Sequence, residues 1–244
     1  MRTGVALLLG GLLLAGCGDG SGGDDKPQGG TEPKPEASTS APAPDTAGAL
    51  TSAQLNAAAL ADGEKVGRYT ASEYTLGAPL GESYTAAPAV CQPLVSLAEE
   101  VADPDPAAEV HRNVDVPDEL TGTTVGVTLR SYGSDGAATV LKNLDTAGKQ
   151  CAGGFTEERA IAKAQYLKVE TLTAPKLGDE AVAFKFTILD VKGKLKLYEY
   201  LTVVRSGTTT LSFRGEITDT KDIGGVPPEV IDAQWKKFQG AAKV

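Results

Sequence analysis

Apolar and polar residues alternate in several stretches of this chain, with the two-residue period of a β-strand that buries one face. The clearest run is GTTVGVTLRSY at 122–132, where valine and leucine alternate with threonine and arginine. This run predicts a half-buried strand with a polar side made of Thr124, Thr128 and Arg130. The same reasoning predicts further strands over 165–172, 180–189, 195–205 and 208–216. Short connections around Gly193 and Gly207 predict hairpin turns between the last three strands.

Other stretches repeat apolar residues at helical spacing and carry helix-start signals. Thr51 and Gln54 form a predicted capping box, flanked by Leu50 and Leu55 as a hydrophobic staple, for a helix that ends near residue 61. A second short helix is predicted over 92–101 and a third from a Ser134 cap to Gly148, just before Cys151. Two prolines at 227 and 228 begin a fourth helix, whose predicted contact stripe is Val230, Ile231, Gln234, Trp235 and Phe238.

This order of elements predicts an α+β fold, in which three or four helices pack on an antiparallel sheet. Long strands joined by hairpins do not suit a doubly wound parallel sheet, because parallel strands need long crossover connections. We expect one globular domain over residues 50–244. Its apolar share is sufficient for a core, since 41% of the whole chain is hydrophobic.

The first 49 residues differ in composition from the rest. Arg2 is followed by a short apolar run and then by Leu14-Ala15-Gly16-Cys17, which resembles a bacterial lipobox. We expect a signal peptide over 1–16, lipidation of Cys17, and a disordered linker rich in glycine, serine and proline over 17–49. The alternative is an ordinary secretory signal with a chance cysteine. The predicted location is the outer face of the cell membrane.

Export also bears on the two remaining cysteines. An oxidising compartment favours a disulfide between Cys91 and Cys151. The alternatives are a reactive thiol pair or a metal site. Neither is supported by a CxxC motif, and His111 is the single histidine available as a further ligand.

The sequence contains few residues arranged for catalytic chemistry. His111 lies in a predicted edge strand and has no GxSxG partner, so a surface or packed histidine is the simpler interpretation. Carboxylates cluster near residues 103–105, 115–119 and 179–180, without calcium-loop spacing, and are typical of solvated loops in a chain of net charge -9. The same negative charge argues against nucleic acid as a partner. We predict no enzyme activity, no metal and no cofactor.

Five aromatic residues are the candidate ligand-binding residues. Phe184 and Phe186 share one face of a predicted strand, and Tyr198 and Tyr200 share one face of the next. With Trp235 they are predicted to line a groove between sheet and helix that suits a moderately apolar ligand. The alternative is that these aromatic residues simply form the core.

Several short motifs occur in an order that resembles a known family. They are Leu50-Thr51 with Leu55-Asn56, the alternating strand and the helix that ends in Cys151, Gly178-Asp179-Glu180-Ala181, and Val203-Val204-Arg205-Ser206-Gly207. They resemble the extracellular sensor domain of the mycobacterial serine/threonine kinase PknH, a type that recurs in actinobacterial lipoproteins. The resemblance implies helices packed on an antiparallel sheet, a groove for an unknown ligand, and no enzymatic activity. That domain carries two disulfides, whereas only one is expected here.

The sequence therefore predicts a lipid-anchored extracytoplasmic protein that binds a ligand or acts like a sensor, without catalysis. Its expected partners are the membrane, through the lipid anchor, and either a small apolar ligand or an envelope protein. One alternative is a structural or protein-interaction module of the cell envelope. Another is a glycan hydrolase that uses carboxylates.

Overall fold

The structure is a computed structural model that describes residues 48–73, 84–96, 104–117, 123–158, 163–190, 192–217 and 220–241. These residues belong to one compact unit that covers 43–244. The predicted signal peptide 1–16, the lipidated Cys17 and the predicted linker as far as residue 47 lie outside the described residues. Within the described part, no helix is both long and apolar enough to cross a membrane.

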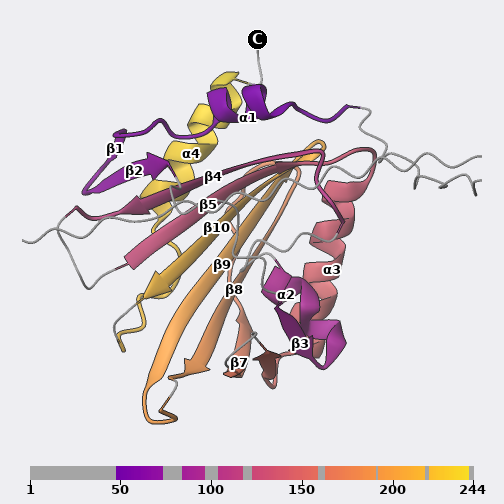
Figure 1. The fold of residues 1–244 in the computed structure, drawn as a ribbon, viewed down its shortest axis with the longest axis vertical. Helices are drawn as coiled ribbons and strands as arrows, with labels where there is room; N and C mark the ends of the chain where they lie inside the picture. Colours follow the sequence, from indigo (N-terminus) through magenta and orange to yellow (C-terminus); the bar gives the residue numbers. More distant parts are fainter. Residues whose placement is uncertain are drawn as a thin grey trace, which may run out of the picture. The chain divides into compact units, whose positions relative to one another are not determined.

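The described strands form one antiparallel sheet in the order β1-β2-β4-β5-β10-β9-β8-β7-β6-β3 (Figure 1). Their bounds are β1 Lys65–Val66, β2 Tyr69–Glu73, β3 Thr85–Ala87, β4 Ala108–Asp115, β5 Thr123–Ser131, β6 Phe155–Glu158, β7 Lys163–Thr171, β8 Glu180–Leu189, β9 Lys196–Ser206 and β10 Thr209–Ile217. The helices are α1 Ser52–Ala58, the 3-10 turn η1 Ala89–Cys91, α2 Gln92–Ser96, α3 Gly136–Gln150 and α4 Pro228–Ala241. The α+β fold predicted from the sequence is confirmed.

Both predicted hairpin turns are present, between β8 and β9 and between β9 and β10. Gly193 and Gly207 have φ angles of 66° and 58°. This left-handed conformation is open to glycine at little cost, which explains why glycine occupies each turn.

Helices α1 and α4 pack on one face of the sheet, which we call the α4 face. Its core includes Leu55, Val127, Phe213 and Val230, all fully buried. The predicted Thr51–Gln54 capping box is present at the start of α1. Gln234 is a polar residue on the apolar stripe of α4. Its side-chain amide accepts a hydrogen bond from the Leu60 N–H and donates one to the Ala58 carbonyl, so it satisfies backbone groups at the end of α1.

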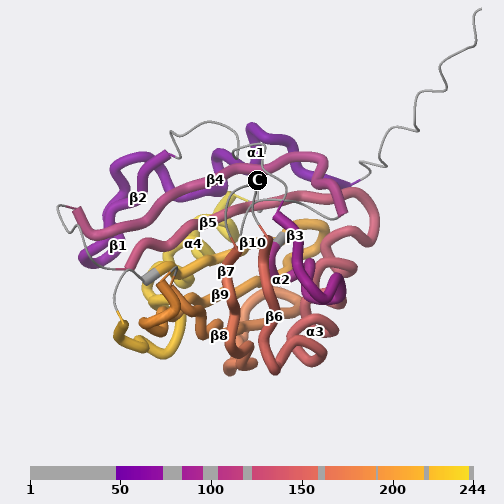
Figure 2. Tube along the Cα trace, turned by 60° about the horizontal axis from the view of Figure 1, so that its bottom comes forward, coloured from indigo at the N-terminus to yellow at the C-terminus, as the bar shows by residue number. Residues whose placement is uncertain are grey.

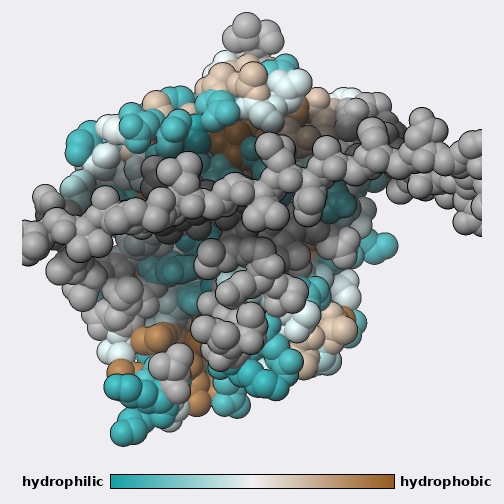
Figure 3. Space-filling model, viewed as in Figure 1, coloured by the Kyte–Doolittle hydropathy of each residue, from teal (hydrophilic) through white to brown (hydrophobic). Residues whose placement is uncertain are grey.

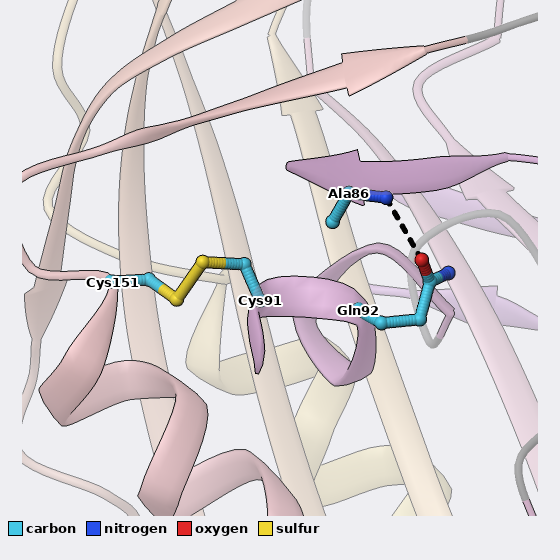
Figure 4. Close-up of a disulfide and its surroundings, with 4 residues drawn as sticks. All are labelled: Ala86, Cys91, Gln92 and Cys151. Atoms are coloured by element: carbon cyan, nitrogen blue, oxygen red, sulfur yellow. Dashed lines mark hydrogen bonds between the residues drawn. A yellow bond between two sulfur atoms is a disulfide. The ribbon is translucent and has the colours of Figure 1, made fainter. Parts of the chain in front are cut away.

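Helix α3 packs on the opposite face, which we call the α3 face, together with α2, which also contacts the edge strand β3 (Figures 1 and 2). A disulfide joins Cys91, at the end of η1, to Cys151, the residue that caps α3, with the two Cα atoms 5.9 Å apart (Figure 4). Beside it, Gln92 accepts from the Ala86 N–H and donates to the Tyr84 carbonyl, which fixes β3 against α2.

Three local predictions need correction. The strand that contains His111 is not at the edge, because β4 lies between β2 and β5. The N-cap of α3 is Asp135 rather than Ser134, its side chain makes no capping bond, and the helix continues to Gln150. The second half of β5 is buried on both faces: Thr128 and Arg130, predicted on its polar side, are themselves buried.

Candidate functional site: a buried polar surface on the sheet

The five predicted groove residues do not come together. The register of the β8–β9 hairpin pairs Lys185 with Tyr200 and Phe186 with Glu199, so even-numbered residues of one strand lie opposite odd-numbered residues of the other. Because paired residues share a face, Phe184 and Phe186 belong to the α3 face, whereas Tyr198 and Tyr200 belong to the α4 face. Phe184, Phe186 and Tyr200 are buried among apolar side chains. The predicted groove is therefore wrong.

Tyr200 holds the segment before α4 onto the sheet. Its hydroxyl donates to Asp222 and accepts from the Ile223 N–H. Burial and the Asp222 carboxylate together raise the pKa of Tyr200 to about 12, so the hydroxyl keeps its proton. Tyr198 lies nearby with the Lys185 ammonium 6.0 Å from the centre of its ring. These contacts give both tyrosines a structural role.

The α3 face itself has two halves of different character. The apolar half, on β7, β8 and β9, carries Val169, Phe184, Phe186, Leu201 and Val203, which belong to the same core as α3. The polar half lies on the neighbouring strands β4, β5 and β10. It consists of two cross-strand rows, Glu109–Arg130–Thr210 and His111–Thr128–Ser212.

The residues of the polar half on β5 and β10 are buried as deeply as a core. Arg130 and Thr210 are 0% exposed, Ser212 is 3% exposed and Thr128 is 8% exposed. Burial of a polar group without a hydrogen bond costs free energy, and burial of a charge costs more. A sheet that uses these positions only for packing would carry valine or leucine there, as the apolar half does.

Arg130 is the centre of this surface. Its Nε lies 3.1 Å from Glu109 Oε2 and donates a hydrogen bond to it. Its two terminal nitrogens, Nη1 and Nη2, have no hydrogen-bond partner among the residues that the structure describes. The same holds, within the described chain, for the Thr210 and Ser212 hydroxyl oxygens. The buried guanidinium of Arg130, which we call the fork, therefore lies beside the two buried hydroxyl groups of Thr210 and Ser212.

Glu109 and His111 set the charge around this fork. His111 Nε2 lies 3.5 Å from Glu109 Oε1, and His111 Nδ1 lies 3.1 Å from the Thr128 hydroxyl oxygen. The hydrogen bond with His111, together with the positive charge of Arg130, lowers the pKa of Glu109 to about 2, although burial opposes this shift. Glu109 is therefore ionised throughout the physiological pH range and compensates part of the buried positive charge.

Tyr132 lies at the end of the same surface. Burial raises the pKa of its phenol, and the nearby Arg130 guanidinium acts in the opposite direction. The Thr210 hydroxyl lies close to the phenol and also lowers this pKa. The phenol keeps its proton at neutral pH and offers one more hydroxyl beside the fork.

Three residues of this surface resemble a catalytic triad in type. Thr128, His111 and Glu109 follow the order hydroxyl, imidazole, carboxylate, as in a hydrolytic triad. However, β5 is paired on both sides, with β4 and β10. Its backbone N–H groups are therefore used in hydrogen bonds of the sheet and do not form an oxyanion hole. Among the described residues, no group of three or more His, Cys, Asp or Glu is placed to hold a metal ion.

The sequence signals for this surface were incomplete. Alternation along β5 placed Arg130 on a polar side, but as a solvent-facing residue. Thr210 and Ser212 gave no signal of their own. Their importance depends on the pairing of β4, β5 and β10, because only this pairing brings three polar sides together.

No protein-family model and no curated protein sequence matches the chain. Among solved structures, the chain is similar to the extracellular domain of PknH from Mycobacterium tuberculosis, with 13% identity and a TM-score of 0.49, over 80% of this chain and 93% of that one. It is also similar to a putative uncharacterized protein of Mycobacterium smegmatis, an Rv0999 ortholog, with 13% identity and a TM-score of 0.35, over 72% and 88% of the two chains. The first is the domain that the sequence motifs resemble.

Proposed function

We propose that this chain is a lipid-anchored, extracytoplasmic, sensor-like protein that binds a small acidic ligand on the polar half of the α3 face and has no catalytic activity. The observation that carries the proposal is Arg130, a fully buried arginine whose two terminal nitrogens have no partner among the described residues. A guanidinium fork binds a carboxylate or phosphate through two parallel hydrogen bonds.

The sequence suggested a partly apolar ligand, because it grouped the aromatic residues into one groove. Those residues lie on two faces of the sheet, and the surface that is chemically incomplete is polar instead. Thr210, Ser212 and Tyr132 add hydroxyl groups beside the fork, so a ligand with an acidic group and further oxygen atoms suits the site best. The extracytoplasmic location rests on the export signal and the lipobox-like Cys17.

The hydrolase alternative is weaker. A glycoside hydrolase needs one carboxylic acid that holds a proton for the leaving group. Glu109, the carboxylate of this surface, has its pKa lowered to about 2 and is therefore ionised. The interaction-module alternative would need a broad apolar patch. Figure 3 shows apolar surface near the end of the β8–β9 hairpin, and the exposed large apolar residues of the described chain are Val90, Leu195 and Ile223, in three separate segments. Single exposed apolar residues are ordinary on protein surfaces.

Calorimetric titration tests the proposal with acetate, succinate, citrate and inorganic phosphate, with glucose as a neutral probe. The parent should bind at least one of the anions and not glucose. Arg130→Lys keeps the charge but removes the fork. The loss of a charge-assisted bond, about 1.5–3 kcal/mol, should weaken binding about 10- to 100-fold.

The matched control is Arg68→Lys, the same chemical change at an exposed turn between β1 and β2. It should bind like the parent. The proposal fails if the parent binds none of the four anions, or if the Arg130→Lys and Arg68→Lys proteins have the same affinity. In cells, Cys17→Ala should move the protein from the membrane fraction to the medium, and full retention would remove the lipid anchor from the proposal.

A further inference from the structure

A second recess lies away from the polar half, beside α4. It has a volume of about 430 Å³ and is bounded by the C-terminal half of α4, the residues that lead into β8, and the end of β9. The residues that matter for its chemistry are Trp235, Phe238, Gln239, Lys176, Asp179 and Ser206. Volumes of this size are ordinary for small-molecule sites.

One wall of the recess is aromatic. Trp235 and Phe238 are one turn apart on α4, and their rings stack with centroids 5.9 Å apart and planes 23° from parallel. Phe238 is buried, whereas Trp235 is only half-buried. The buried phenylalanine therefore supports the indole from below, and the indole keeps accessible apolar surface at the recess.

The opposite wall is fixed in place by the backbone. The Asp179 N–H donates to the Arg205 carbonyl, and Asp179 Oδ2 accepts from the Gly207 N–H and from Arg205 Nη1. Gly178 has a φ of 65°, and a Cβ there would lie 2.2 Å from the Arg205 carbonyl oxygen, so only glycine allows this close approach. The recess is thus pre-formed, which lowers the entropic cost of binding.

The polar groups of the recess are of both kinds. The Lys176 ammonium is a donor, the Asp179 carboxylate is an acceptor, and Gln239 and Ser206 can do both. The contacts that hold the wall use Asp179 Oδ2, so its other oxygen remains available as an acceptor. A purely apolar ligand would leave these groups without partners, and a simple anion would meet Asp179.

A sugar ring suits both the aromatic wall and the mixed donors and acceptors of this recess. One face of a pyranose presents C–H groups that pack on an indole, while its hydroxyl groups each donate and accept hydrogen bonds. We propose that this recess binds a neutral sugar unit of a polysaccharide, with Trp235 as the stacking platform and Asp179 and Gln239 as hydrogen-bond partners for its hydroxyls. This site is independent of the proposed acid site at Arg130, which lies on the other face of the sheet.

The chain itself provides the reporter, because Trp235 is its single tryptophan. Tryptophan emission is followed while maltotriose, cellotriose, mannotriose or triacetylchitotriose is added to the protein. We expect a saturable change with at least one trisaccharide. Gln239→Ala removes one or two hydrogen bonds from an exposed helix position and should weaken that binding about 2- to 10-fold. Calorimetry of Trp235→Ala with the same trisaccharide should give no binding.

Lys236→Ala, an exposed neighbour on α4 outside the recess, is the matched control and should behave like the parent. Arg130→Lys should also leave sugar binding unchanged, which separates a failure here from a failure at the acid site. The proposal is overturned if no trisaccharide gives a saturable change. It is also overturned if the Gln239→Ala and Lys236→Ala proteins bind equally well, or if the Trp235→Ala protein still binds.

Discussion

On the α3 face, β7–β9 and the group β4, β5 and β10 belong to one sheet and both carry buried side chains, yet these side chains differ in kind. The apolar half presents residues such as Phe186 and Leu201 to α3. The polar half presents Arg130, Thr210 and Ser212, each with buried polar atoms that have no partner among the described residues. Burial of a large apolar side chain stabilises the fold by about 1.5–3 kcal/mol. A buried unpartnered polar group costs about 1–3 kcal/mol.

The two halves therefore have different roles in the molecule. The apolar half holds the sheet, α3 and the disulfide together, so its composition follows from stability. The polar half lowers stability at the same depth, so its composition calls for another reason, and binding is the reason that its chemistry supports. Substitutions in one half should therefore leave the properties of the other half unchanged.

The largest effect should come from the disulfide beside the apolar half. Replacing both Cys91 and Cys151 with alanine removes a link across a sequence separation of 60 residues. The chain-entropy relation gives a loss of about 4 kcal/mol in the free energy of unfolding. Urea denaturation of the double variant and the parent measures this loss.

Anion binding by the folded double variant should remain that of the parent, because Arg130 and its neighbours lie on other strands. If the double variant were as stable as the parent, the apolar half would not depend on this link. If it remained folded but lost anion binding, the two halves would not be separable.

A smaller effect should appear in acid at the polar half. The pKa of Glu109 is lowered in the folded protein from 4.5 to about 2, so its ionised form favours the folded state above pH 4.5. That stabilisation should be lost as the pH falls from about 4.5 to about 2. Glu109 is 35% exposed, and solvent screening reduces the expected loss to about 1–2 kcal/mol.

Urea denaturation between pH 2 and pH 6 measures this dependence for the parent and for Glu109→Gln. The difference in unfolding free energy between the two proteins should shrink across that window. A difference that stays constant down to pH 2 would show that Glu109 is not held ionised by His111 and Arg130.

Much of the fold follows from local sequence signals. The Thr51–Gln54 capping box, the turns at Gly193 and Gly207 and the start of α4 at its prolines depend on neighbouring residues, and each is present in the structure. The pairing of Cys91 with Cys151 followed from the cysteine count once Cys17 was assigned to lipidation.

The predictions that were wrong concern features that depend on residues far apart in the chain. The β8–β9 register pairs even-numbered residues of one strand with odd-numbered residues of the other, and this decides which aromatic side chains share a face. The pattern within either strand alone does not determine this register. The position of β4 inside the sheet depends on the short strands β1 and β2, which extend the sheet beyond it. Arg130 looked solvent-facing because alternation within one strand cannot reveal burial of both faces.

The role of the polar half in binding is tested by the stability of a variant that removes both of its charges, Arg130→Met with Glu109→Gln. Replacing a buried ion pair with apolar or neutral residues of similar volume is often neutral or stabilising, by up to about 4 kcal/mol. We predict that the free energy of unfolding of this double variant, measured at pH 7 in urea, equals or exceeds that of the parent, while anion binding is lost. A loss of about 2 kcal/mol or more, as expected for a core residue, with anion binding unchanged, would contradict the account.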